Sequence, residues 1–183
     1  MCIRDSVDVV GLSRASAPHP AQRLFACHHH PVSSAHPHGV FQNGFDLVDD
    51  DERVLATFDG SVWGERGTVS AGSGEWEFTR GGGQLLLTEA GSPVAYARRR
   101  TLFSATWEVG YDGRVHTLVR RGVWFPRYEL RDDSGTTLGH VAQGSWVGRA
   151  LAVRLPDALR PETQAFVAAV AMTLMQRARR AGA

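Results

Sequence analysis

The chain has 183 residues, enough for one domain with a substantial core, and its formal net charge of +1 gives no bulk attraction to nucleic acid. The sequence contains no lysine, which excludes a P-loop lysine and a Schiff-base lysine. The cysteines Cys2 and Cys27 both lie near the N-terminus, so the chain beyond them has no disulfide, thiolate nucleophile or cysteine-based zinc site. This composition fits a reducing compartment, and we expect a cytoplasmic protein.

Residues 1–40 are rich in Ser, Ala, Pro and His and show no hydrophobic periodicity. Most of the eight histidines lie here, but their spacing is not that of a fixed zinc site, so we assign no metal ligand among them. We predict that residues 1–40 are a disordered tail, or a stretch foreign to the native protein. A single domain is then expected over residues 41–183.

The region from Phe41 to Leu155 has a period of two. Trp107 and Val109, for example, alternate with Thr106, Glu108 and Gly110, as in a strand with one buried face. Short glycine-containing turn signals separate these runs. The pattern predicts about nine to eleven short antiparallel strands, arranged as a meander that closes into a barrel.

A hairpin pattern recurs three times in this region. An acidic residue follows a central leucine by two positions in Phe45–Asp49, in Leu85–Glu89 and in Tyr128–Asp132. We expect each acidic side chain to accept backbone N–H bonds across the turn, and glycine in the turn to adopt positive φ.

The segment from Pro161 to Arg180 predicts a helix, because it combines good helix formers with Pro161 at the first position and arginines at the end. Residues 165–175 are uncharged on every face, so the helix must be buried. The uncharged part rises only about 16 Å, too short for a hydrocarbon core of about 30 Å. A closed barrel of this size needs a filled interior. The predicted fold is therefore mainly β, a closed antiparallel barrel around a buried C-terminal helix.

These features resemble the tubby C-terminal-like superfamily, which includes LURP-one-related proteins and phospholipid scramblases, and in particular its short actinobacterial members. The resemblance rests on the aromatic-x-Leu-x-Asp-x-x-Gly hairpin at Tyr128–Gly135, its echoes at Phe45 and Leu85, the strand around Trp107, and the terminal helix. It covers residues 41–180 and implies a barrel of about twelve strands around a central helix. Some relatives bind phosphoinositides or act at membranes. Their phosphoinositide site uses lysine as well as arginine, so no binding residue is carried over to this chain.

Two arginine runs are the candidate site for an anionic lipid or another anion. They consist of Arg98, Arg99 and Arg100 in one strand and Arg120 and Arg121 in another. Arginine suits phosphate because its guanidinium binds two oxygens at once. Strand alternation sends neighbouring arginines to opposite faces of the sheet, so the runs bind one anion only if the fold brings them together.

No catalytic motif, metal site or cofactor motif is evident, and we expect a non-catalytic domain that binds an anionic membrane surface or a protein partner. Two alternatives remain open. One is a hydrolase that uses His116 or His140 as acid or base. The other is a lipocalin-like carrier with an open lumen and the helix outside.

Overall fold

The structure is a computed structural model of the chain and describes residues 33–37, 44–61, 65–101, 105–122, 125–144 and 150–181. Within these ranges, strands precede a single helix. The strands are β1 (Ser33–Pro37), β2 (Phe45–Val48), β3 (Val54–Gly60), β4 (Gly67–Ala71), β5 (Gly74–Gly81), β6 (Gln84–Glu89), β7 (Ser92–Arg99), β8 (Thr106–Tyr111), β9 (Arg114–Arg121), β10 (Arg127–Arg131), β11 (Thr137–Gln143) and β12 (Leu151–Arg154), and the helix is α1 (Pro161–Ala181).

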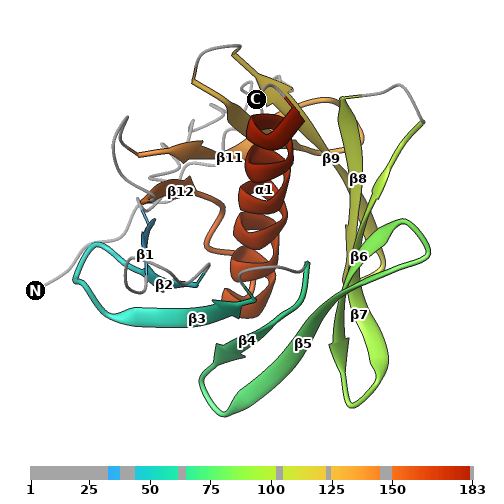
Figure 1. The fold of residues 1–183 in the computed structure, drawn as a ribbon. Helices are drawn as coiled ribbons and strands as arrows, with labels where there is room; N and C mark the ends of the chain where they lie inside the picture. Colours follow the sequence, from blue (N-terminus) through green and yellow to red (C-terminus); the bar gives the residue numbers. More distant parts are fainter. Residues whose placement is uncertain are drawn as a thin grey trace, which may run out of the picture.

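The strands form one closed antiparallel barrel (Figure 1). Each strand pairs with its neighbours in sequence, and β1 closes the barrel by pairing with both β12 and β2. Closure removes the unpaired edges that an open sheet would leave. The predicted fold class is confirmed, and the twelve strands observed match the number implied by the resemblance rather than the smaller number indicated by the periodicity alone.

The inner face of the barrel carries the apolar half of each alternating run. Leu85 and Leu87 of β6 point inward and are 0% and 1% exposed, whereas Leu86 between them lies on the outer face. Aromatic rings continue this core from the strands to the helix. Ring centroids lie 5.4 Å apart for Phe45 and Phe58, 5.3 Å for Phe58 and Phe78, and 5.9 Å for Phe78 and Phe166 of α1.

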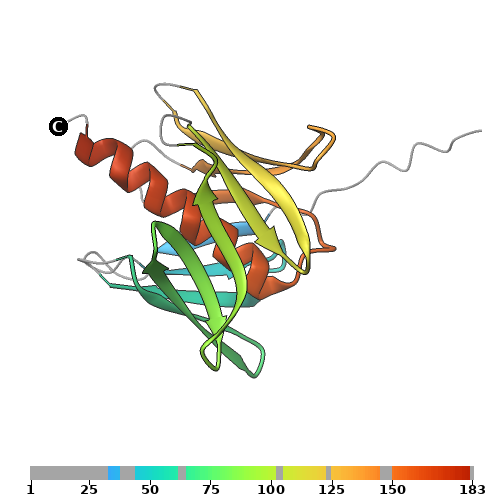
Figure 2. The same cartoon turned by 90° about the vertical axis from the view of Figure 1, so that its right-hand side faces the viewer.

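Helix α1 runs through the barrel, as Figures 1 and 2 show from two directions. Every residue from Ala165 to Ala171 is 0% exposed, so no face of this segment meets solvent. The carbonyl of Arg160 accepts the N–H groups of Thr163 and Gln164, so the helix begins at Pro161. The prediction of a buried central helix is confirmed.

The filled interior contradicts the lipocalin-like alternative. A carrier of that kind needs an open lumen with the helix outside, but here the helix itself occupies the lumen. The physical reason is the uncharged segment 165–175, which has no polar face to present to water.

The predicted domain boundary at residue 40 is wrong for Ser33–Pro37. These residues form β1, which pairs with β2 through Ser34–Pro37 and with β12 through Ser33–Ala35. Ala35 is 1% exposed and belongs to the core. The rest of the predicted tail, residues 1–32 and 38–40, lies outside the described residues.

The recurring hairpin corresponds to β2–β3, β6–β7 and β10–β11. In each, the strand register shifts directly after the central leucine, at Leu47, Leu87 and Leu130. Each of these leucines is at most 1% exposed. The sequence pattern therefore marks a buried leucine followed by a bulge, a feature that increases strand twist and helps a sheet to curve.

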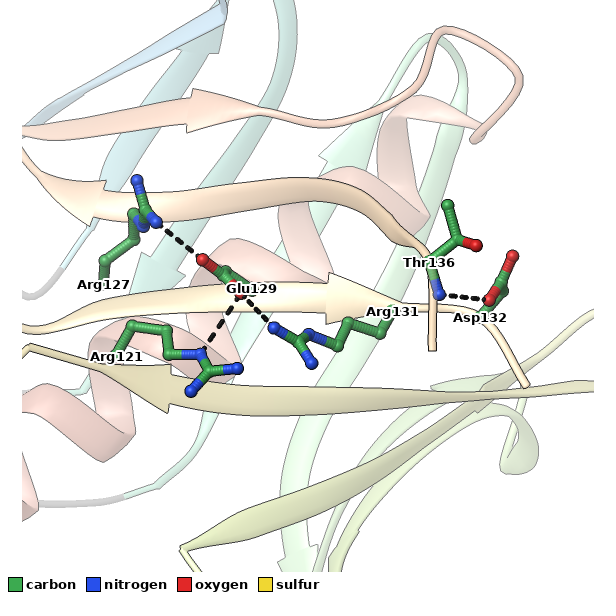
Figure 3. Close-up of polar contacts among 6 residues, drawn as sticks. All are labelled: Arg121, Arg127, Glu129, Arg131, Asp132 and Thr136. Atoms are coloured by element: carbon green, nitrogen blue, oxygen red, sulfur yellow. Dashed lines mark hydrogen bonds and ion pairs between the residues drawn. The ribbon is translucent and has the colours of Figure 1, made fainter. Parts of the chain in front are cut away.

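The turns of these hairpins differ in detail. Asp49 Oδ1 accepts the N–H of Arg53 at 2.9 Å, as expected. Asp132 Oδ1 likewise accepts the N–H of Thr136 at 2.8 Å (Figure 3). Glu89 instead stays in the strand ladder opposite Ser92, because the turn after it has only two residues. The acceptor prediction is thus confirmed for the two longer turns.

Candidate functional site

The two ends of the barrel are distinguished by α1, which begins at one and ends at the other. We call them the N-end, where Pro161 lies, and the C-end, where Ala181 lies. In a meander of antiparallel strands, successive connections alternate between the two ends. The connections β1–β2, β3–β4, β5–β6, β7–β8, β9–β10 and β11–β12 therefore lie at the C-end, where the helix emerges in Figure 2.

The C-end is strongly basic. Its arginines were taken from the described connections, the terminal two residues of each strand and the last five residues of α1. They are Arg66, Arg80, Arg98, Arg99, Arg100, Arg120, Arg121, Arg127, Arg177, Arg179 and Arg180. The carboxylates in the same described positions are Asp46, Asp59 and Glu65.

The N-end has the opposite character. By the same criterion its described carboxylates are Asp49, Asp50, Asp51, Glu52, Glu75, Glu89, Asp112, Asp132, Asp133, Asp157 and Glu162. Its described arginines are Arg53, Arg114, Arg131, Arg154 and Arg160. A chain with a net charge of +1 is therefore polarised along the barrel, with arginine in excess at one end and carboxylate at the other.

All five predicted arginines lie at the basic C-end, but on two faces of the sheet. The pairing of Arg98 with Glu108 and of Arg99 with Trp107 assigns Arg98 to the outer face and Arg99 to the inner side. Arg98 donates to Glu108 at 2.7 Å, and the backbone N–H of Arg100 donates to the carbonyl of Thr106 at 3.1 Å.

The second run is divided in the same way. Arg120 stands opposite the buried Tyr128 on the inner side, and Arg121 stands opposite Arg127 on the outer face. The two runs lie on β7 and β9, with β8 between them. The fold thus brings the runs to one end of the barrel, and alternation separates their members as expected.

On the inner side, arginines gather around Trp107 at the mouth of the barrel. The guanidinium carbon of Arg99 lies 5.9 Å from the ring centroid of Trp107, and that of Arg177 lies 5.4 Å from it. Contacts of this length are cation–π interactions. A strand and the helix therefore present two cations to one indole ring.

Glu65 is the carboxylate that connects α1 to the barrel wall at this mouth. It accepts from Arg177 Nε at 2.5 Å and lies 3.1 Å from Arg80 NH1. The hydrogen bond from Arg177 holds the pKa of Glu65 below its usual value. Glu65 therefore offsets part of the positive charge of these two arginines, whereas no ion pair with a described residue is found for Arg120 and Arg180.

A second arginine cluster covers the outer face of β9 and β10 (Figure 3). Glu129 accepts from Arg127 at 2.6 Å, from Arg131 at 2.7 Å and from Arg121 at 3.4 Å. The bond from Arg131, followed by those from Arg127 and Arg121, lowers the pKa of Glu129 to about 2. One carboxylate is thus shared by three guanidinium groups, which leaves the cluster with excess positive charge.

His116 and His140 do not form an acid–base pair. His116 is 8% exposed and its ring stacks on Tyr111 at 4.5 Å, on the inner side of the sheet. His140 stands opposite Glu129 and Arg154, on the outer face. Burial lowers the pKa of His116, which favours the neutral ring.

Within the described ranges, no group of three His, Cys, Asp or Glu side chains is placed to hold a metal ion. In the same part of the chain, no helix is both long enough and apolar enough to cross a membrane.

The arginines of α1 and of β3–β5 were not predicted as site residues. They could have been found by assigning each strand end to one end of the barrel, because arginines outnumber carboxylates at the described connections and strand termini of the C-end.

Comparisons with known proteins gave no match: no family model, no curated protein and no solved structure is significantly similar to this chain. The resemblance to the tubby-like superfamily stays a prediction, and the function has to be argued from the site itself.

Proposed function

We propose that this chain is a non-catalytic domain that binds anionic phospholipid membranes, as a peripheral protein of the cytoplasm, through the basic C-end of its barrel. The observation that carries the proposal is the separation of charge along the barrel. An anionic surface attracts the C-end and repels the N-end, so it orients the molecule as well as binding it.

The magnitude of this attraction is adequate for reversible binding. A basic residue close to an anionic leaflet contributes about 1 kcal/mol. Arginine is well suited to phosphate head groups because its planar fork makes two hydrogen bonds. Binding of this type weakens as salt concentration rises, because the charges are screened beyond about 10 Å at 0.1 M ionic strength.

The hydrolase alternative has less support. His116 and His140 lie on opposite faces of the sheet, and the residues that line the cleft at His116 include no Ser, Thr or Cys. These observations favour a binding domain. The membrane behaviour of some members of the tubby-like superfamily, which this chain resembles, agrees with the proposal.

The test is binding to vesicles of neutral phosphatidylcholine and to vesicles that also contain an anionic phospholipid, measured by co-sedimentation. Binding is expected for the anionic vesicles and should fall with added salt. The double variant Arg120→Ser, Arg180→Ser removes two exposed charges from the C-end. It should weaken binding by about 2 kcal/mol, or roughly 30-fold.

The matched control is the double variant Arg53→Ser, Arg154→Ser, which removes the same charge from exposed positions at the N-end. It should bind almost as the parent does. Equal losses in both double variants would show that net charge rather than the C-end governs binding. If the chain bound neither kind of vesicle but bound an acidic protein, the C-end would be a binding site for a protein rather than for a membrane.

A further inference from the structure

A cleft lies at the N-end of the barrel, where β9 extends past the end of β10. The ladder between these strands ends at Thr117 and Arg131, so Arg114–His116 continue beyond it. The cleft has a volume of about 620 Å³. The lining residues are Arg114, Val115, His116, Asp132, Asp133 and Leu138. This volume lies within the range of roughly 300–1,000 Å³ that small-molecule sites occupy.

His116 is the residue of this cleft with a buried polar atom that lacks a hydrogen-bond partner in the described part of the chain. Its side chain is more than nine-tenths buried, and its Nδ1 atom has no hydrogen-bond partner among the described residues. A buried polar atom without a partner destabilises the fold. The Tyr111 ring stacked on His116 restricts the orientation of the imidazole. A ligand that donates to Nδ1 would remove the cost of burying it unpaired.

The charges around His116 define the ligand further. Asp132 accepts hydrogen bonds from Ser134 Oγ at 2.6 Å and from the N–H of Thr136 at 2.8 Å, which fixes its carboxylate in place. Asp133 adds a second carboxylate and Arg114 a cation, both exposed. The cleft therefore offers two negative charges and one positive charge.

We propose that this cleft binds a free α-amino acid with a basic side chain. The complement of two carboxylates and one guanidinium is a ligand with two cationic groups and one carboxylate. The α-carboxylate pairs with Arg114, and the two cationic groups pair with Asp132 and Asp133. One ligand N–H donates to His116 Nδ1. The aliphatic chain of the ligand packs on Val115 and Leu138.

The site is independent of the proposed membrane function. It lies at the opposite end of the barrel, so a membrane-bound molecule would present it to the aqueous phase. The vesicle experiment and the ligand experiment therefore test separate statements.

The first experiment measures the binding of L-arginine to the full chain by titration calorimetry, with two analogues as comparisons. Agmatine lacks the carboxylate, and L-citrulline has no charge on its side chain. Arginine is expected to bind saturably at one site, and each analogue about tenfold more weakly, since each loses one charged pair. General attraction of cations to the acidic N-end would instead rank agmatine first, which would overturn the proposal.

The second experiment uses variants at the cleft. Asp133→Asn and Arg114→Gln change exposed residues, so both should fold and bind arginine about tenfold more weakly. The control Asp157→Asn removes the same charge at the N-end from a residue that does not line the cleft, and should bind as the parent does. An equal loss in the control would overturn the proposal.

The third measurement addresses His116 directly. The ¹⁵N chemical shift of its Nδ1 atom should change on titration with arginine. His116→Phe retains a flat ring for the stack on Tyr111 and should weaken arginine binding about tenfold, because one hydrogen bond is lost. Absence of saturable arginine binding to the parent chain, or binding only of a basic peptide blocked at both ends, would overturn the proposal. The latter result would identify the cleft as a docking site for a protein.

Discussion

At the scale of single residues, two equivalent turns differ in one backbone position. Asp49 and Asp132 begin turns in which the third residue along, Glu52 or Gly135, donates its N–H to the carbonyl of that aspartate at 3.1 Å in each case. Gly135 has φ of 85°, and Glu52 has φ of 60°. Glycine adopts this left-handed region without steric cost, whereas glutamate does not. The β2–β3 turn is therefore strained at Glu52.

Replacing Glu52 by glycine should relieve this strain. We expect Glu52→Gly to raise the free energy of unfolding by about 0.5–1 kcal/mol, after the greater freedom of glycine in the unfolded chain is taken into account. Chemical denaturation measures the difference. Glu52→Gln is the control. It removes the charge from an acidic turn but keeps a side chain of similar size at a position whose backbone is left-handed.

The reverse change at the equivalent position completes the comparison. Gly135→Ala should lower the free energy of unfolding by about 1 kcal/mol. A Cβ atom at Gly135 would meet nothing within 4 Å, so the loss comes from the backbone alone. If Glu52→Gln stabilises the chain as much as Glu52→Gly, charge repulsion rather than backbone strain is the cause.

Sequence alone could predict some of these residue roles and not others. Alternation correctly separated Arg98 from Arg99 and Arg120 from Arg121, because it follows from strand geometry. The sharing of Glu129 by Arg121, Arg127 and Arg131 depends on which strands are neighbours and in which register. That register is a tertiary property, and the sequence did not reveal it.

At the scale of elements, the helix was the most predictable part of the chain. Residues 165–175 carry no charge, and burial on all sides is the one arrangement open to such a helix in water. Strand β1 was the least predictable. Its sequence, SSAHP, has no apolar alternation, and it is ordered by the free edges of β2 and β12 on either side of it.

The buried helix leads to a prediction about charge. Ala168, Ala169, Val170 and Ala171 follow one another around the helix and are each 0% exposed. An aspartate at any of these positions would either bury an unpaired carboxylate or stay protonated at a large cost. We expect all four single Asp variants to give little folded protein, measured as yield and melting temperature.

Ala181→Asp is the control for these variants, because Ala181 is the exposed last residue of α1. It should fold within a few degrees of the parent. An amphipathic surface helix would tolerate aspartate at one or more of the four consecutive positions. A single tolerated variant among them would therefore contradict burial of the helix on all sides.

At the scale of the whole molecule, the charge polarity follows from the order of the hairpins. The connection after β2 reads Asp49-Asp50-Asp51-Glu52-Arg53, and the connection after β7 begins at Arg100. Since connections alternate between the ends, this difference in sign becomes a difference between the ends. Motifs assessed one at a time do not reveal it, because the charges separate only when each connection and strand terminus is assigned to one end of the barrel.

The closed barrel depends on β1, although this strand contributes few apolar side chains. Without it, the edges of β2 and β12 lose their partners, and the cover that β1 provides beside Leu47 and Leu151 is removed. Unpaired strand edges cost free energy when buried and promote association when exposed. Closure therefore makes a short polar strand important to the stability of the whole domain.

Two truncated chains test this role of β1. A chain that begins at Ser33 keeps the strand, and one that begins at Val40 lacks it. We expect the shorter chain to lose about 3 kcal/mol or more relative to the longer one, which corresponds to roughly 10 °C in melting temperature for a domain of this size. It should also associate in a concentration-dependent manner, because two strand edges are left unpaired.

Scanning calorimetry and light scattering on the two chains provide the comparison. Equal melting temperatures and equal masses in solution would mean that β2 and β12 need no strand between them, which would contradict the closed barrel.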